Sequence, residues 1–101
     1  MDDRALRDKL ADAGRILESE GQGDYCMGHV TLRTTENPDR ILMKAGGMGL
    51  EEMTPENIVT INIEGEKTSG THQRHNEVFI HSEIMRVRPE IQSVVHTHAP
   101  F

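Results

Sequence analysis

Apolar side chains near the start of the chain recur at the spacing of one helical face, with charged or small residues between most of them. Four residues form this stripe: Leu6, Leu10, Ala13 and Leu17. The 3.6-residue period predicts an amphipathic helix over about residues 3 to 20. Asp2 or Asp3 can cap its first turn, and Gly21 suits its end.

The middle of the chain has short runs of alternating apolar and polar residues, which are typical of strands. Residues 30–33 and 40–44 are two such runs, and Asn37-Pro38-Asp39 between them favours a turn, so we expect a β-hairpin. Residues 54–57 read Thr-Pro-Glu-Asn, which is typical of a short helical turn. Residues 58–63 are rich in β-branched side chains and predict another strand.

We expect a polar loop over residues 67–74, then a helix over 76–86, then a strand over 93–98. Three residues at i, i+4 and i+7 mark an apolar side of the helix: Ile80, Ile84 and Val87. Glu77 and His81 form an i, i+4 pair on a different side. The valines at 94 and 95 favour an interior strand. The order of helix, strands, helix and strand indicates a layered α/β fold.

Charge and composition narrow the classes of function. The chain has 101 residues, with 17 acidic and 11 basic side chains and a formal net charge of −6. This balance argues against binding to a nucleic-acid backbone, which needs a basic surface. No run approaches the roughly 20 apolar residues of a membrane span, and the acidic start does not resemble a signal peptide. A single cysteine, Cys26, excludes an internal disulfide, so we expect a cytoplasmic protein.

Two histidines near the end of the chain are the strongest candidates for chemistry. His96 and His98 lie two positions apart on the expected strand, so their imidazoles project from the same face. Paired imidazoles suit zinc and other late divalent metals. The spacing alone is equally consistent with two solvated histidines. Glu77 has the same ambiguity, because it can act as a general base or a metal ligand, or can lie on a solvated helix face beside His81.

Taken together, these segments resemble the class II aldolase/adducin family, whose members include fuculose-phosphate aldolase and ribulose-phosphate epimerase. The most specific part is a glutamate and a histidine on a helix, followed by Arg-Pro-Glu and a His-x-His strand. The matching segments are residues 28–33, 41–43 with Gly46 and Gly47, 54–59, Glu77 with His81, 88–90 and 93–100. The resemblance covers nearly the whole chain, so residues 1–101 are interpreted as one domain, the N-terminal part of a longer family member.

The resemblance implies a three-layer α/β/α fold with a central mixed, largely antiparallel sheet, apparently truncated here, and a homotetramer. In the family, the histidines of the His-x-His strand bind a divalent metal, which implies His96 and His98 as ligands of Zn²⁺, with Mn²⁺ or Co²⁺ as alternatives. A helix glutamate acts as acid and base in the family, and Glu77 matches it. The family's third metal histidine lies farther along the chain, beyond Phe101.

By the same resemblance, a small-molecule substrate is held beside the metal by His29, Gly46, Gly47, His75 and Asn76. Sugar-phosphate aldolases usually carry Asn at the first of these positions and serines at the last two. A carboxylated or aromatic hydroxy-acid substrate therefore fits at least as well as a phosphorylated one. The expected function is a metal-dependent lyase that breaks a carbon–carbon bond, by aldol cleavage or decarboxylation, through a metal-stabilised enediolate. The alternatives are a non-catalytic, adducin-like interaction domain, or an epimerase or dehydratase of the family.

Overall fold

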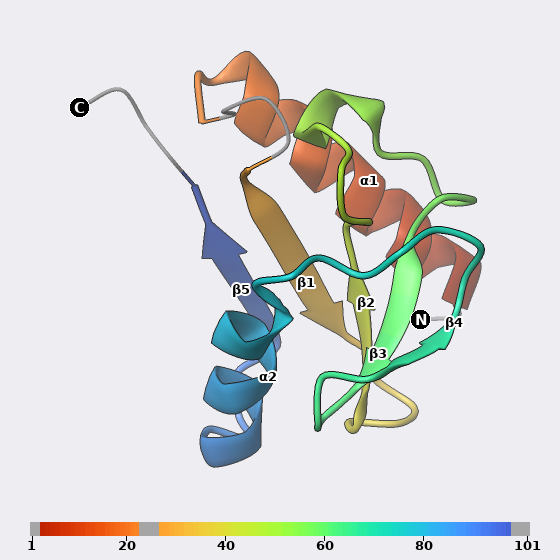
Figure 1. Ribbon diagram of the computed structural model, residues 1–101, viewed down its shortest axis with the longest axis vertical. Helices are drawn as coiled ribbons and strands as arrows, with labels where there is room; N and C mark the ends of the chain where they lie inside the picture. Colours follow the sequence, from red (N-terminus) through yellow and green to blue (C-terminus); the bar gives the residue numbers. More distant parts are fainter. Residues whose placement is uncertain (1–2, 23–26, 98–101) are drawn as a thin grey trace.

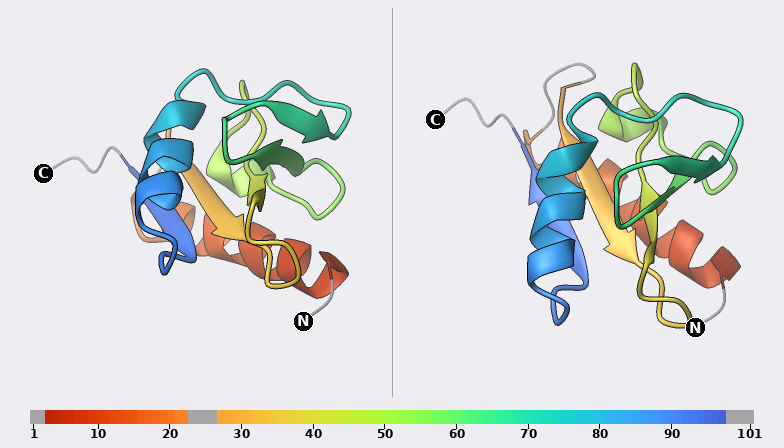
Figure 2. Two further views of the ribbon diagram at one scale, coloured as in Figure 1. Left: turned by 90° about the horizontal axis from the view of Figure 1, so that it is seen from below. Right: turned by 60° about the horizontal axis from the view of Figure 1, so that its bottom comes forward.

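A five-stranded sheet is the centre of the computed structural model, which describes residues 3–22 and 27–97 (Figure 1). The elements are α1 (Asp3–Ser19), β1 (His29–Arg33), β2 (Arg40–Met43), the 3-10 helix η1 (Leu50–Glu52), β3 (Val59–Asn62), β4 (Lys67–Ser69), α2 (Val78–Val87) and β5 (Ser93–His96). The strand order is β4-β3-β2-β1-β5, and every neighbouring pair among these strands is antiparallel. The two helices lie on opposite faces of the sheet, which confirms the expected three-layer α/β/α arrangement (Figure 2).

α1 packs on one face of the sheet through the apolar stripe that predicted it. Leu6 and Leu10 are buried in a cluster that also contains Val30, Leu42, Leu50, Met53 and Ile58. The helix stops at Gly21, whose φ of 75° lies in the left-handed region that glycine adopts without strain. The Gln22 amide donates to the carbonyl of Leu17 at 2.9 Å, which completes a Schellman-type cap.

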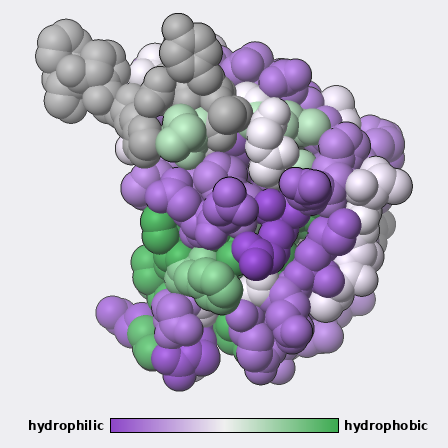
Figure 3. Space-filling model, in the orientation of Figure 1, coloured by the Kyte–Doolittle hydropathy of each residue, from purple (hydrophilic) through white to green (hydrophobic). Residues whose placement is uncertain are grey.

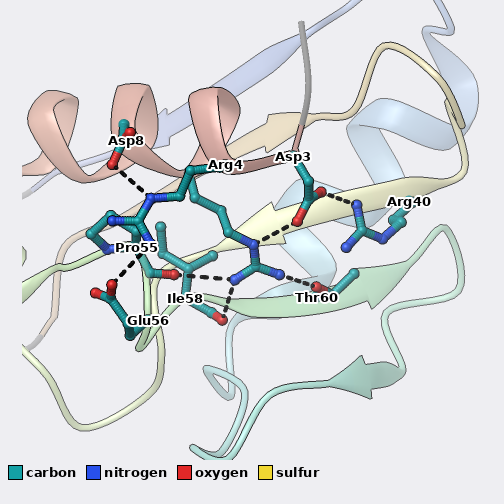
Figure 4. Close-up of polar contacts among 9 residues, drawn as sticks. Asp3, Arg4, Asp8, Arg40, Pro55, Glu56, Ile58 and Thr60 are labelled. Carbon is teal, nitrogen blue, oxygen red and sulfur yellow. Dashed lines mark hydrogen bonds and ion pairs between the residues drawn. The ribbon is translucent and has the colours of Figure 1, made fainter.

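Arg7 binds the first turns of α1 to the sheet, and its partners Asp3, Ile58 and Thr60 are labelled in Figure 4. Its guanidinium donates to Oδ2 of Asp3 at 2.8 Å, to the Ile58 carbonyl at 3.1 Å and to Oγ1 of Thr60 at 3.1 Å. Asp3 also forms an ion pair with Arg40 of β2. The hydrogen bond from Arg40, helped by the one from Arg7, lowers the pKa of Asp3 to about 2. These polar contacts fix the position of the start of α1 relative to β2 and β3.

The opposite face of the sheet packs against α2 through a second apolar cluster. It contains Ile41, Met43, Ala45, Val59, Ile61, Val78 and Met85. The buried residues of α2 are Val78, His81, Ser82 and Met85. The apolar side expected from the sequence instead faces solvent, with Ile84 38% and Val87 60% exposed, and apolar surface is visible where α2 lies (Figure 3). The sequence marked this side only as apolar. The mixed face of the helix is the one that packs, because β1 offers polar partners to His81.

The hairpin of β1 and β2 is confirmed, with Arg33 directly opposite Ile41 before the turn. The Arg33 side chain is buried and donates to the backbone carbonyls of Pro38, Met85 and Ile91 at 2.8 to 2.9 Å. One arginine therefore joins the hairpin turn to the end of α2 and to the start of β5.

Three local details differ from, or refine, the sequence expectations. The loop over residues 67–74 contains the exposed strand β4, which becomes a strand only by pairing with β3. Residues 54–57 form one turn, in which the Asn57 amide donates to the Thr54 carbonyl at 3.2 Å. β5 lies at one end of the described sheet rather than inside it. Within residues 3–22 and 27–97, no helix is both long and apolar enough to span a membrane.

Candidate functional site

β1 carries polar side chains on the face that α2 covers. Alternation along the strand turns Val30 and Leu32 towards α1, and turns His29 and Thr31 towards α2. β5 runs antiparallel beside β1, with His29 directly opposite His96. Their imidazole rings stack with centroids 4.6 Å apart and an interplanar angle of 10°. Strand pairing therefore places His96, the first expected metal ligand, in stacking contact with His29.

Glu77 approaches the same point from the helix layer. It occupies the N-cap of α2, its side chain makes no capping hydrogen bond, and its Oε1 lies 3.2 Å from Nε2 of His29. The Glu77 amide donates to Nδ1 of His75 at 3.2 Å. The His75 ring stands edge-on to that of His29, with centroids 4.4 Å apart. The start of α2 thus places a carboxylate and an imidazole over β1.

Two more polar groups continue these contacts into the protein. Nδ1 of His29 is in hydrogen-bond contact with Nε2 of His81, and Nδ1 of His81 lies 2.8 Å from Oγ1 of Thr31. The side chains of His29, His81 and Thr31 have no accessible surface. His29, His75, His81 and His96 together are termed the histidine cluster below.

Burial sets the charge of the inner part of this cluster. Loss of hydration lowers the pKa of His29 to about 4, although the hydrogen bond to Glu77 opposes it. Loss of hydration also lowers the pKa of His81 to about 3, and the neighbouring histidines add to the effect. The hydrogen bond with His29 lowers the pKa of Glu77. At pH 7 the site therefore combines the neutral imidazoles of His29 and His81 with an ionised carboxylate, which can accept a proton or bind a cation.

A cleft of about 430 Å³ opens beside Glu77. It is lined by Gly46, Gly47, Arg74, His75, Asn76 and Glu77, among others. Its walls approach closely at Gly46, where an added Cβ would lie 2.7 Å from the Arg74 carbonyl oxygen. The Gly46 amide donates to the Gln73 carbonyl at 2.9 Å. Four of the five residues expected to hold substrate therefore line one cleft, and the fifth, His29, lies buried behind Glu77.

A divalent cation fits the polar groups at this point. One ligand atom from each of His29, Glu77 and His96 lies within 4.8 Å of the other two. Imidazole nitrogens and carboxylate oxygens are donors that zinc takes in proteins. His96 thus lies in a metal-competent set together with the expected base. His98, the other expected ligand, lies outside the described residues.

Thr31 and His81 are the parts of this site that the sequence did not bring forward. His81 was noted as a helix-face neighbour of Glu77 and as part of the family motif, with no role assigned to it, and the fold turns it to β1. A signal was present in the sequence, because His29 and Thr31 alternate with the apolar Val30 and Leu32. A strand that is covered on both faces and polar on one of them requires buried hydrogen-bond partners.

Residues 8–101 match the model of the family described as Class II Aldolase and Adducin N-terminal domain. The chain is 35% identical over 97 residues to a 5-methylthioribulose-1-phosphate/5-deoxyribulose-1-phosphate aldolase of Rhodospirillum rubrum, covering 96% of this chain and 42% of that protein. It is 32% identical over 102 residues to a 3,4-dihydroxyphthalate decarboxylase of Arthrobacter keyseri, covering 93% and 40%. A solved L-fuculose 1-phosphate aldolase of Glaciozyma antarctica matches with a TM-score of 0.88 and 31% identity, over 95% of this chain and 41% of that one. The chain spans about two fifths of the length of these relatives.

Proposed function

Because this chain belongs to the class II aldolase and adducin family, we propose that it supplies the base and part of the metal site of a divalent-metal-dependent lyase. The proposed reaction breaks a carbon–carbon bond of a small hydroxylated carbonyl or carboxylate compound. The observation that carries the proposal is the meeting of Glu77, His29 and His96 beside a cleft. Titratable groups with shifted pKa values that gather at a cleft are typical of functional sites.

The proposed metal ligands are His96 and His98, with Glu77 beside them. The donor types favour Zn²⁺, and Mn²⁺ or Co²⁺ are alternatives. When bound, the cation supplies Lewis-acid stabilisation of the negative charge that develops on substrate oxygens. His96 comes from β5 and Glu77 from the start of α2, so two layers of the fold hold the two groups in register.

Glu77 is the proposed acid and base. Its side chain is 41% exposed, whereas the His29 side chain that contacts it is fully buried. The Glu77 carboxylate therefore contacts the buried His29 on one side and is open to the cleft on the other. It can accept a proton from a substrate hydroxyl and return it to the carbon that becomes electron-rich when the bond breaks.

The cleft favours an anionic substrate. Arg74 lies at its wall, with its guanidinium carbon 5.5 Å from the centroid of the Phe79 ring. His75 and Asn76 offer neutral polar groups beside it. Both a carboxylate and a phosphate suit these groups. The relatives cover both chemistries, because one is named as a sugar-phosphate aldolase and another as a decarboxylase of an aromatic acid.

The same family membership supports a homotetramer in the cytoplasm, with a small molecule rather than a nucleic acid or a membrane as partner. The net charge of −6 is consistent with this set of partners. Light scattering on the purified protein measures the assembly directly, and a monomer across the concentration range would contradict the tetramer.

A non-catalytic, adducin-like interaction domain is the second candidate. An apolar groove of about 400 Å³ between α1 and β5 favours it, because the groove is lined by residues such as Leu17, Leu32 and Val95. Ile16 and Val95 remain at least half exposed there. Such a groove can receive a partner segment without any chemistry. The polar site around Glu77 favours the enzyme.

Metal analysis tests the proposed site directly. We expect purified wild-type protein to retain a divalent metal, and His96→Ala to lose most of it, because an imidazole donor is removed. His72→Ala is the matched control, because His72 is exposed in the segment after β4. Equal metal content in wild type and His96→Ala would remove His96 from the ligand set.

Glu77→Gln separates metal binding from chemistry. We expect this variant to hold metal and to lose turnover by about 10² or more, because the amide cannot take up the proton. Turnover is measured with 3,4-dihydroxyphthalate, by release of carbon dioxide, and with 5-deoxyribulose 1-phosphate, by release of an aldehyde. Equal activity of Glu77→Gln and wild type would exclude Glu77 as the base. Wild-type protein that neither binds metal nor turns over either compound would support the interaction domain.

A further inference from the structure

The polar contacts beneath His29 end in two residues that the proposed function does not use. His81 contacts the inner nitrogen of His29, and Thr31 contacts the far nitrogen of His81. We propose that Thr31 and His81 are positioning residues that hold His29 in the tautomer with its proton on Nε2, so that His29 donates a hydrogen bond to Glu77. The catalytic consequence rests on the proposed function, whereas the tautomer does not.

Only one proton can lie between the facing nitrogens of His29 and His81. Nδ1 of His29 faces Nε2 of His81, so one of these nitrogens donates and the other accepts. Burial keeps both rings neutral at pH 7, and a neutral imidazole carries a single proton. The direction of donation at this contact therefore decides the state of both outer nitrogens, Nε2 of His29 and Nδ1 of His81.

The contact with Glu77 selects one direction. An ionised carboxylate can only accept, and Oε1 of Glu77 lies 3.2 Å from Nε2 of His29. In the opposite direction, a lone pair on Nε2 would face the carboxylate oxygen. Nε2 of His29 must therefore donate, which leaves Nδ1 to accept from His81.

The contact with Thr31 can complete the direction that Glu77 selects. Oγ1 of Thr31 lies 2.8 Å from Nδ1 of His81 but 3.4 Å from the Val94 carbonyl. Once His81 donates to His29, its Nδ1 can only accept, and the single hydroxyl proton of Thr31 has the shorter contact there rather than at Val94. Donation thus runs from Thr31 to His81, from His81 to His29 and from His29 to Glu77. Each of these three contacts then has one donor and one acceptor.

This direction has a consequence for the metal. With a proton on Nε2 and Nδ1 accepting from His81, His29 has no lone pair for a cation, although one of its ring nitrogens lies within 4.8 Å of ligand atoms of Glu77 and His96. His29 is then a neutral hydrogen-bond donor that orients the Glu77 carboxylate, and the metal depends on the other ligands. The opposite tautomer would instead make His29 a metal ligand, so the two assignments are experimentally distinct.

Nitrogen NMR of metal-free protein distinguishes the tautomers. Long-range ¹H–¹⁵N correlation of chelator-treated, ¹⁵N-labelled wild-type protein near pH 7 should show a pyrrole-type Nε2 and a pyridine-type Nδ1 for both His29 and His81. A pyridine-type Nε2 on His29 would overturn the proposal and favour a metal ligand. The measurement needs neither substrate nor metal, so its failure is separate from a failure of the proposed lyase activity.

Thr31→Val and Thr31→Ser test the hydrogen bond from Thr31 to His81, which is the one farthest from Glu77. Valine removes the hydroxyl at similar size, so the tautomers of His81 and His29 should become mixed, whereas serine should preserve them. With a turned-over substrate, Thr31→Val should lower kcat roughly tenfold with little change in KM, and serine should restore it. Unchanged tautomers in Thr31→Val would overturn the role of Thr31.

If Thr31→Val fails to fold, His81→Gln provides the second test, because its side-chain amide can still donate to His29 and should keep the Nε2 proton. A pyridine-type Nε2 in His81→Gln would overturn the role of His81.

Discussion

Replacement of Gly46 by alanine should damage the cleft as well as stability. A Cβ at this position would lie 2.7 Å from the Arg74 carbonyl oxygen and 3.2 Å from the Cα of His75. Both are backbone atoms, so no side-chain rotation relieves the contact. Ordinary contact begins at 3.4 Å, so the segment must move by about 0.7 Å. The same movement strains the 2.9 Å hydrogen bond from the Gly46 amide to Gln73.

Two opposing contributions decide how much unfolding free energy Gly46→Ala loses. Overpacking of this kind costs about 1–3 kcal/mol, and alanine recovers about 0.4–1 kcal/mol by restricting the unfolded chain. We therefore expect Gly46→Ala to lose about 1–2 kcal/mol of unfolding free energy. The displaced segment leads directly into Glu77, and a shift approaching 1 Å in a catalytic group lowers turnover by roughly tenfold to a hundredfold.

Urea denaturation measures the stability of Gly46→Ala, and turnover at equal metal loading measures the effect on the site. Gly21→Ala is the matched control, because Gly21 has a φ of 75° and no neighbouring atom within 4 Å of an added Cβ. It should lose about 1 kcal/mol through backbone strain and keep wild-type turnover. Wild-type stability and turnover in Gly46→Ala would refute the reasoning, as would equal loss of turnover in the two variants.

Two further predictions concern stability. The pKa of Asp3 is about 2 in the folded protein and 3.8 without its partners, so its stabilisation is complete above about pH 4 and is lost as the pH falls towards 2. Because Asp3 is partly exposed, we expect Asp3→Asn to cost about 1 kcal/mol at pH 7 and progressively less as the pH falls through 2. A pH-independent loss in urea titrations would contradict this origin. Arg33→Lys should cost about 2–4 kcal/mol, because an ammonium group cannot reproduce the fork that reaches three separated carbonyls. The exposed Arg86→Lys should change stability by less than about 0.5 kcal/mol, and equal urea midpoints for the two variants would exclude the proposed role of Arg33.

Short-range patterns predicted most of the elements because their signals lie within a few residues. The stripe from Leu6 to Leu17 and the glycine after it were sufficient for α1 and its end. Asn37-Pro38-Asp39 was sufficient for the hairpin, since turn chemistry is local. β4 was missed, because Lys-Thr-Ser becomes a strand only beside β3.

The candidate site divides in the same way. The sequence by itself predicted a helix that contains Glu77 and a strand that contains His96, and the family resemblance assigned roles to both; the structure places Glu77 at the N-cap of that helix. Only the tertiary structure decided that His29 joins them, and that His81 and Thr31 lie beneath it. His29 and His81 are 52 positions apart, and their contact depends on the pairing of β1 with β5 and on which face of α2 packs against the sheet. Apolar periodicity marked a side of α2 on which Ile84 and Val87 are exposed, because periodicity does not register the buried hydrogen-bonding groups that β1 presents.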